Sequence, residues 1–240
     1  MAADIPGSRV VITGAAQGLG AALARAFADA GARLVLMDRD AEALASLGAQ
    51  TGGLCLPVDL SDASATQDAI AQMLAEDGRV DTLIHNAAIL VPEPLADLEF
   101  AMFRATLDVG IQAGYLLARA ALPSMQANGG AMIFVSSQSG IRGFADETAY
   151  CAAKHALEGF SKSVALEEPG IVSCTITPGK AMRTPMSERN YTDDLKAQWV
   201  DPAMLSPAFL HIATTRDPKF SGERLNAWDI AQSLKGDIHA

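Results

Sequence analysis

Short apolar runs alternate with alanine-rich stretches of helical spacing along almost the whole chain. The apolar runs cover residues 9–15, 33–38, 54–60, 80–88, 131–137, 171–179 and 223–229. The alanine-rich stretches cover 18–30, 40–49, 62–77, 98–127, 148–167 and 202–214. Several runs are apolar at consecutive positions, as in strands covered on both faces, and strands alternating with helices form right-handed βαβ units. The sequence therefore predicts an α/β fold: a doubly wound parallel sheet of about seven strands with helices on both faces.

Length and composition favour one domain. The chain has 240 residues, 50% of them hydrophobic and 19% charged, which is enough to bury one large core. We expect residues 1–240 to form a single domain. The interval 180–201 lacks strong periodicity and is rich in charges and methionine, so it is the predicted substrate loop. The tail, residues 230–240, could fold over a neighbouring subunit or extend freely.

Several classes of partner are disfavoured. A net charge of -10 argues against nucleic acid, whose phosphates it would repel. No apolar stretch reaches the roughly 18 residues of a membrane span, and residues 1–9 lack the features of a signal peptide. Cys55, Cys151 and Cys174 have no CxxC or metal-ligand spacing, so we expect small buried residues in a reducing compartment. These features predict a cytoplasmic protein with no metal, no membrane and no nucleic acid.

The first apolar run passes into a glycine-rich turn, TGAAQGLG at 13–20, where the next helix begins. Gly14 can adopt backbone angles closed to larger residues, Gly18 lets the backbone approach a pyrophosphate, and Gly20 lets the helix pack close to the strand. The helix N-terminus supplies N–H donors and partial positive charge. The turn therefore predicts a dinucleotide site of the Rossmann fold, with an ordinary tight turn as the alternative.

The second apolar run ends in Asp38 and Arg39. An acidic residue at this distance from the glycines suits the two hydroxyls of a ribose and repels a 2′-phosphate, which predicts NAD as the cofactor. Two alternatives stay open. Asp38 could instead cap the helix that starts near Asp40, and Arg39 could hold a phosphate and favour NADP.

From the glycine turn onward, the motifs follow the order found in the short-chain dehydrogenase/reductase family. Thr13-Gly14, followed after three residues by Gly18-Leu19-Gly20, resembles the family's TGxxxGxG turn. FVSSQSG at 134–140 and YCAAK at 150–154 resemble its catalytic serine and YxxxK pair. The weaker matches are VDL at 58–60, HNAA at 85–88, TPG at 177–179 with Thr184 one residue later than usual, and GERLNAWD at 222–229. Singly each motif is modest, and in this order they are highly specific.

The resemblance implies an NAD cofactor and a homodimer or homotetramer joined partly through the helices at 98–127 and 148–167. It implies that the catalytic residues are Ser137, Tyr150 and Lys154. The cofactor-binding residues that it implies are Gly14, Gln17, Gly18, Leu19, Gly20, Asp38, Arg39, Asp59, Leu60, Asn86, Ala87, Ala88, Tyr150, Lys154, Pro178, Gly179 and Thr184.

The residue types fit this chemistry. Tyr150 and Lys154 are four apart and share a helix face, where an ammonium stabilises a phenolate. Tyr150 can exchange a proton with an alcohol or ketone while the cofactor takes or gives a hydride, and Ser137 can hold the substrate oxygen. Singly, these residues are more often a packed aromatic, a solvated charge and a strand-end cap. Together they predict an NAD-dependent oxidoreductase that interconverts a secondary alcohol and its ketone.

One position departs from the family. Its members usually carry an Asn in the helix before the serine strand, thought to anchor a water that links the lysine to solvent, and this position is Gly110. A glycine can preserve a helix irregularity and leave its carbonyl open to water, whereas Asp108 and Gln112 point elsewhere. The departure predicts slow turnover. It also leaves open a non-catalytic NAD(H)-binding sensor or interaction protein, beside the further alternative of an NADP-dependent carbonyl reductase.

Other candidates carry weaker signals. We expect His85 to be a hydrogen-bonded structural histidine rather than a general base, and the remaining histidines form no constellation with cysteines or carboxylates. Two sets of residues in or near the predicted substrate loop could contact substrate or simply pack and be solvated: Phe144, Met182, Met186, Tyr191 and Trp199 as an apolar lining, and Arg142, Arg183 and Arg189 as anion ligands.

Overall fold

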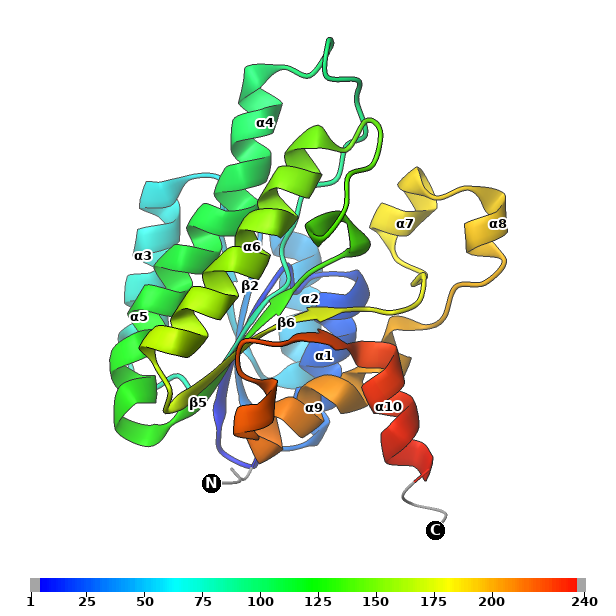
Figure 1. The fold of residues 1–240 in the computed structure, drawn as a ribbon. Coiled ribbons are helices and arrows are strands. Elements are labelled where there is room, and N and C mark those ends of the chain that lie inside the picture. The colour runs from blue at the N-terminus through cyan, green and yellow to red at the C-terminus, as the bar shows by residue number, and fades with distance from the viewer. Residues whose placement is uncertain (1–4, 237–240) are drawn as a thin grey trace.

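Seven parallel strands form one sheet in the structure, a computed structural model that describes residues 5–236. The strands lie in the order β3-β2-β1-β4-β5-β6-β7 (Figure 1). Their bounds are β1 Arg9–Thr13, β2 Arg33–Asp38, β3 Leu54–Pro57, β4 Thr82–His85, β5 Gly130–Val135, β6 Ile171–Thr177 and β7 Arg224–Asn226. The predicted doubly wound parallel sheet is confirmed.

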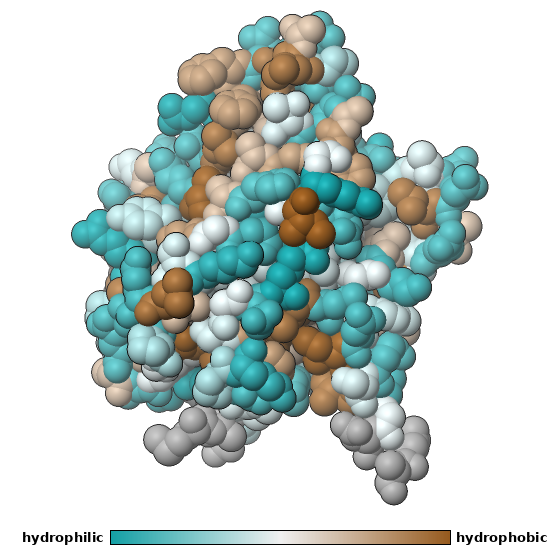
Figure 2. Space-filling model, viewed as in Figure 1, coloured by the Kyte–Doolittle hydropathy of each residue, from teal (hydrophilic) through white to brown (hydrophobic). Residues whose placement is uncertain are grey.

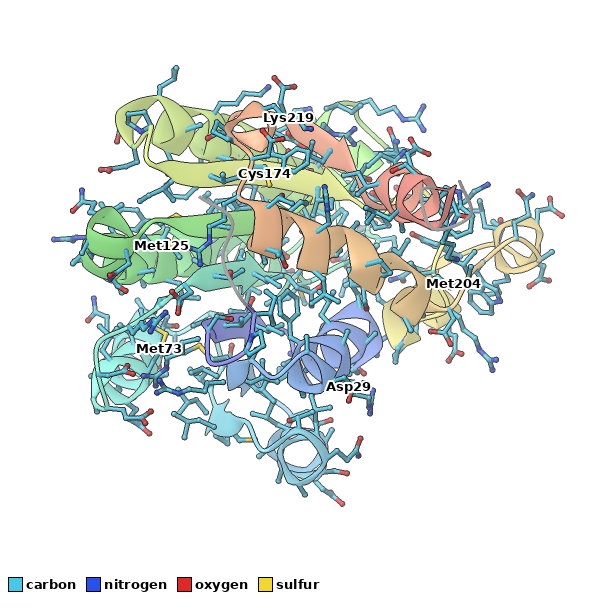
Figure 3. All side chains as sticks on the ribbon, turned by 90° about the horizontal axis from the view of Figure 1, so that it is seen from below. Asp29, Met73, Met125, Cys174, Met204 and Lys219 are labelled. Atoms are coloured by element: carbon cyan, nitrogen blue, oxygen red, sulfur yellow. The ribbon has the colours of Figure 1, made fainter. Side chains whose placement is uncertain are left out.

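Helices cover both faces of the sheet. One layer holds α3 (Ala63–Leu74), α5 (Ala113–Asn128) and α6 (Thr148–Glu167), and the other holds α1 (Gly18–Asp29), α2 (Ala41–Thr51) and α9 (Ser206–Thr215). Seen from below, Met73 and Met125 mark the first layer, Asp29 marks the second, and Cys174 lies on β6 between them (Figure 3). The predicted helices on both faces are therefore present.

Strand β1 shows why these runs are apolar at successive positions. Val10 and Ile12 pack in the apolar cluster with residues of α1 and α9, and Val11 packs in the cluster with residues of α3 and α5. All three are fully buried. Because both faces of the sheet are covered, the polar residues of β1, Arg9 and Thr13, stand at its two ends.

The strand order reverses at β1, which pairs with β2 on one side and β4 on the other. In open α/β sheets, ligands bind outside the carboxyl ends of the strands at such a switch point. Thr13 ends β1, His85 ends β4, and Ser137 lies just past the end of β5. The fold thus brings the motifs of three distant segments to one edge of the sheet.

The helix expected at 98–127 is interrupted. It consists of α4 (Phe100–Leu107), a π-helical turn (Asp108–Gln112) and α5. Gly110 is at the centre of the π-helical turn, and Nε2 of His85 lies 3.1 Å from the carbonyl oxygens of both Val109 and Gly110. A π-turn widens the helix by one residue, which frequently marks a functional position.

The interval 180–201 is more ordered than a loop without secondary structure. It contains α7 (Pro185–Asn190) and α8 (Asp193–Lys196). Met182 and Val200 form an isolated parallel bridge that closes the segment at its base. The lack of periodicity in the sequence reflects two helices that are each too short to show an apolar stripe.

The chain continues from β7 into α10 (Ala227–Gly236), which packs beside α9 and buries Ala231. The part of the tail up to Gly236 is therefore helical, and residues 237–240 lie outside the described part of the chain. Within the described residues, none of the helices has the length and apolar character needed to cross a membrane.

Candidate active site

The glycine turn has the geometry that its sequence predicts. Gly14 and Gly18 have φ angles of +61° and +55°, which L side chains rarely adopt. A Cβ atom at Gly20 would lie 2.0 Å from the carbonyl oxygen of Gly14, so only glycine allows α1 to pack this closely on the turn. A Cβ at Gly18 would lie 3.2 Å from Thr184 of the substrate loop. The glycine turn therefore packs closely against Thr184 of segment 180–201.

The N-terminus of α1 is open for an anion. Its N-cap, Gln17, makes no side-chain hydrogen bond to the helix, and the first turn holds no acidic residue. The first N–H groups of a helix have no intrahelical acceptors, and the helix dipole adds partial positive charge. This donor set fits the pyrophosphate of a dinucleotide.

Asp38 joins the glycine turn to the end of β2. Its carboxylate accepts hydrogen bonds from the backbone N–H groups of Ala16 and Asp40, both at 3.0 Å. The cap of α2 is Asp40, whose own carboxylate accepts from Ala43 N at 3.0 Å. The alternative interpretation of Asp38 as the helix cap is therefore wrong, and its carboxylate is held between the glycine turn and the start of α2.

Residues that follow β3 and β4 lie next to Asp38 and the glycine turn. Asp59 is exposed, and its pKa is lowered by hydrogen bonds from Ser61 and, more weakly, by the charge of Arg39. Leu60 is buried in the core, so only its backbone can face a cofactor. Asn86 donates from Nδ2 to the carbonyls of Thr13 and Gly14 at 3.1 and 3.0 Å, which locks the end of β4 to the glycine turn.

The three residues predicted as catalytic come together. Tyr150 and Lys154 share one face of α6, with Nζ of Lys154 5.5 Å from the centroid of the tyrosine ring. Ser137 follows β5, and its hydroxyl is close enough to Tyr150 to oppose in part the rise in the pKa of the phenol that burial causes. A phenol, a hydroxyl and an ammonium are thus grouped at the carboxyl edge of the sheet.

Burial dominates the ionisation of this group. It raises the pKa of Tyr150, and the charges of Tyr191 and Glu147 act in the same direction. Burial lowers the pKa of Lys154 to about 8, although the charge of Glu158 opposes this shift. Nζ of Lys154 donates to the carbonyl of Val135 at 2.7 Å. The predicted lowering of the Tyr150 pKa by Lys154 is not observed in this arrangement, because burial raises that pKa.

A buried carboxylate beneath this group was missed by the sequence reasoning. Glu158 is 5% exposed and accepts hydrogen bonds from Ser136 Oγ and, at 2.7 Å, from Thr175 Oγ1. It lies one helical turn beyond Lys154, so the series 150, 154, 158 on one face of α6 is a signal that could have found it. Glu158 ties α6 to the ends of β5 and β6.

Arg224 on β7 completes this support. Its Nε donates to Glu158 at 3.1 Å, and its Nη2 donates to the carbonyl of Ser137 at 3.0 Å. Gly140 makes room for the cluster, since a Cβ there would lie 2.6 Å from Ser136 Oγ. The position of Ser137 thus depends on an ion pair that spans α6 and β7.

His85 is a structural histidine, as predicted. It is 1% exposed, its Nδ1 lies 3.0 Å from Thr13 Oγ1, and burial lowers its pKa to about 4. Its Nε2 meets the carbonyl of Gly110, so this carbonyl already has a partner in the protein. A Cβ at Gly110 would lie 2.8 Å from Ala153 Cβ, which leaves no space for a larger residue without movement. Asp108 pairs with Arg104 at 3.6 Å and does not replace the family's Asn, as predicted.

Segment 180–201, the predicted substrate loop, contacts the residues around the site. Thr184 caps α7 by accepting from Ser187 N at 3.1 Å, and Asn190 donates from Nδ2 to the carbonyl of Leu90 at 3.1 Å. Tyr191 follows α7, and its charge raises the pKa of Tyr150. Gly179 begins the loop with a φ of +77°. Of the predicted apolar lining, Tyr191 is thus placed beside a catalytic residue.

The other candidates make separate contacts. Trp199 and Arg183 line a cleft of about 860 Å³ between α1 with the glycine turn, at Ala16, Gln17 and Gly18, and the 183–206 segment. Arg183 also pairs with Glu188 at 3.7 Å, and Arg142 lies 4.9 Å above the ring of Phe144. Met186 is half-buried, Arg189 is exposed, and Met182 packs against the core. These contacts favour packing and solvation for most of the set.

The three cysteines differ in burial. Cys151 and Cys174 are buried, whereas Cys55 is only half-buried, so the prediction is wrong for Cys55. Cys55 is less buried because β3 lies at the edge of the sheet. Its Sγ donates to the carbonyl oxygen of Leu44 at 3.2 Å. Across residues 5–236, no three His, Cys, Asp or Glu side chains are grouped to hold a metal ion.

Comparison with known proteins gives consistent matches. The family model for short chain dehydrogenases matches residues 8–195. D-threitol dehydrogenase of Mycolicibacterium smegmatis is 34% identical over 172 residues, which cover 69% of this chain and 66% of that enzyme. L-xylulose reductase of Mus musculus is 31% identical over 198 residues, covering 81% of this chain and 80% of that enzyme.

A solved structure agrees over nearly the full length. The structure of a short chain dehydrogenase from Pseudomonas syringae superposes with a TM-score of 0.85 at 32% identity, covering 95% of this chain and 98% of that one. The chain belongs to the short-chain dehydrogenase/reductase family of nicotinamide-dependent oxidoreductases.

Proposed function

We propose that the protein is an NAD-dependent oxidoreductase that interconverts a secondary alcohol and its ketone, with residues 1–240 as one domain and 180–201 as its substrate loop. The observation that carries the proposal is the grouping of Ser137, Tyr150 and Lys154 at the carboxyl edge of the sheet. A phenol beside a hydroxyl and a buried ammonium is a proton-transfer site for an alcohol oxygen.

Each side chain has a separate task. A bound nicotinamide would supply the hydride acceptor or donor. Tyr150 takes the proton of the alcohol during oxidation and returns one to the ketone oxygen during reduction. Ser137 holds the same oxygen by a hydrogen bond. Lys154, fixed by the carbonyl of Val135, places its positive charge beneath the tyrosine ring, where it stabilises the phenolate and can hold the nicotinamide ribose.

The preference for NAD rests on Asp38. Its carboxylate is fixed by Ala16 N and Asp40 N, where it can accept hydrogen bonds from ribose hydroxyls and repel a 2′-phosphate. Arg39 is exposed, and part of its charge acts on Asp59. The carboxylate of Asp38 is held in place, whereas Arg39 is exposed and part of its positive charge is balanced by Asp59. This arrangement favours NAD. A clear preference for NADP would make the protein the alternative carbonyl reductase.

The remaining cofactor contacts follow the strand ends. The amides at Gln17, Gly18 and Leu19 would bind the pyrophosphate, and Asp59 with the backbone of Leu60 would meet the adenine. The nicotinamide would lie between the ends of β4 and β6, at Asn86, Ala87, Ala88, Pro178, Gly179 and Thr184.

The second candidate function is a non-catalytic NAD(H) sensor. One observation favours it: Gly110 has no side chain, and its carbonyl is already bonded to His85. The usual anchor for a water beside Lys154 is thus absent. The complete set of Ser137, Tyr150 and Lys154 favours the enzyme.

One experiment separates these functions. NAD and NADP are each mixed with the protein and a panel of secondary alcohols, polyols, hydroxy acids and sterols, and formation of the reduced cofactor is followed by absorbance. Binding of NADH and NADPH is measured in parallel by nicotinamide fluorescence. Turnover with NAD supports the proposal, whereas tight NADH binding with no turnover across the panel supports the sensor.

We also propose a homodimer or homotetramer in the cytoplasm. Phe100, Tyr115 and Leu166, on the helices that the family resemblance assigns to the interface, are 71%, 43% and 86% exposed. Apolar surface gathers over the end of the molecule that carries α4 (Figure 2). Large exposed apolar groups on neighbouring helices are typical of a protein interface. Sedimentation of the purified protein would test the assembly.

A further inference from the structure

A half-buried carboxylate, that of Glu147, lies beside the reacting groups and has no part in the chemistry above. Glu147 immediately precedes α6, three positions before Tyr150. Its Oε2 accepts a hydrogen bond from Ser139 Oγ at 2.8 Å, and Ser139 Oγ lies 3.4 Å from Ser137 Oγ. The carboxylate is therefore two hydrogen-bond steps from the hydroxyl that holds the substrate oxygen.

Three elements meet at this carboxylate. Ser139 comes from the short 3-10 helix after β5, Tyr150 from α6 and Tyr191 from the substrate loop. Burial raises the pKa of both tyrosines, and the negative charge of Glu147 adds to the shift in each. The charge of Glu147 is thus close enough to influence the catalytic phenol and the phenol that the loop brings to it.

The carboxylate also has unused hydrogen-bonding capacity. Within residues 5–236, Ser139 provides its one side-chain hydrogen bond, and no lysine or arginine nitrogen lies within 4.0 Å of it. A carboxylate can accept about four hydrogen bonds. The backbone that carries it is held in place, since the carbonyl of Glu147 accepts from Cys151 N at 2.8 Å and the adjacent carbonyl of Asp146 accepts from Glu93 N at 2.7 Å.

We propose that Glu147 is a specificity-determining residue, which selects alcohols with an uncharged hydroxyl near the reacting carbon and rejects hydroxy acids. The proposal rests on the proposed dehydrogenase function. A fixed carboxylate accepts strong hydrogen bonds from hydroxyls and repels a substrate carboxylate at short range. The charge of Glu147 also opposes phenolate formation at Tyr150, which disfavours proton transfer. A residue that is unfavourable for the chemistry at this place is consistent with a role in substrate recognition.

Substrate pairs that differ only at one terminus test this directly. The pairs are butane-1,3-diol with 3-hydroxybutyrate and threitol with threonate, each a neutral CH₂OH against a carboxylate. The ratio of kcat/KM within each pair is measured for the wild type, for Glu147→Gln, and for Glu167→Gln. Glu167 is exposed at the end of α6 and gives the same change in net charge away from the site.

The wild type is expected to favour the neutral member of each pair by about tenfold or more, and Glu147→Gln to reduce that preference about tenfold. Glu167→Gln is expected to leave it unchanged. If both variants lost the preference for the neutral substrate equally, or if neither variant lost it, the proposal would be overturned. A wild-type preference for the acids would also overturn it.

A second variant guards against loss of the fold in Glu147→Gln, which circular dichroism would show. Glu147→Asp keeps the charge but shortens the reach to the substrate, so the rejection of acids is expected to persist while KM for the neutral alcohols rises several-fold. An unchanged KM would contradict the role in binding. If the wild type oxidises alcohols without discrimination, only this inference fails; if it oxidises none, the proposed function fails with it.

Discussion

Arg224 Nη2 donates a hydrogen bond to the carbonyl oxygen of Ser137 at 3.0 Å, which links the last strand of the sheet to the residue that we propose holds the substrate oxygen. The same guanidinium is paired with Glu158, which reaches it from α6. The ion pair therefore connects the two elements that carry Ser137 and Tyr150. Its loss should alter chemistry as well as stability.

Replacing Glu158 by Gln should shift the pH dependence of turnover. The charge of Glu158 raises the pKa of Lys154, so its removal should move that pKa below about 8 and deprotonate the lysine at lower pH. The alkaline limb of the kcat profile should move to lower pH, with kcat falling more than KM rises. The free energy of unfolding should drop by about 1–3 kcal/mol, because Arg224 is left unpaired. An unmoved alkaline limb would show that Glu158 is only structural.

Replacing Gly20 by Ala should destabilise the protein and weaken NADH binding. The added Cβ would meet the carbonyl oxygen of Gly14 at 2.0 Å, which forces α1 away from the turn, at a cost of about 3 kcal/mol. Gly159 is the matched control, since it is exposed on α6 with no atom within 4 Å of an added Cβ. Gly159→Ala should stabilise the protein by about 0.5–1 kcal/mol. Urea denaturation measures both, and equal effects would contradict the close packing at Gly20.

Replacing Gly110 by Asn should not by itself raise turnover. The slow turnover expected from the missing Asn suggests this variant, but its Cβ would lie 2.8 Å from Ala153 Cβ. We expect Gly110→Asn to lose stability and the double variant with Ala153→Gly to recover part of it. A double-mutant cycle on the free energy of unfolding measures this coupling. Additive effects would show that the two positions do not compete for space.

His85 should make the protein sensitive to acid. Its pKa is lowered from 6.5 to about 4 in the folded state, so the unfolded state binds the proton more tightly. Stability from this group is complete above pH 6.5 and is lost as the pH falls toward 4, by up to about 3 kcal/mol. His85→Gln should flatten the stability profile between these values. Profiles of equal slope for the two proteins would refute the linkage.

The sheet was predictable because its strands are buried on both faces, which leaves a continuous apolar signal in the sequence. The site was predictable where a motif is local, as at Gly14 to Gly20 or Tyr150 with Lys154. Glu158 and Arg224 are 66 residues apart, and nothing in the local sequence shows that they pair. At Gly110 the sequence indicated only that a helix irregularity was possible, and nothing in the local sequence shows the contact of its carbonyl with His85 of β4.

The central claim is that Tyr150 transfers the proton of the substrate alcohol. Tyr191 offers a matched control, since it is a second phenol beside the same site whose pKa burial also raises. The direct measurement is NADH formation from NAD and the best alcohol of the panel by the wild type, Tyr150→Phe and Tyr191→Phe, with NADH binding checked for each. We expect Tyr150→Phe to bind NADH but to lose turnover by a factor of about 100 or more, whereas Tyr191→Phe should retain most of it. Turnover that survives in Tyr150→Phe would contradict the account.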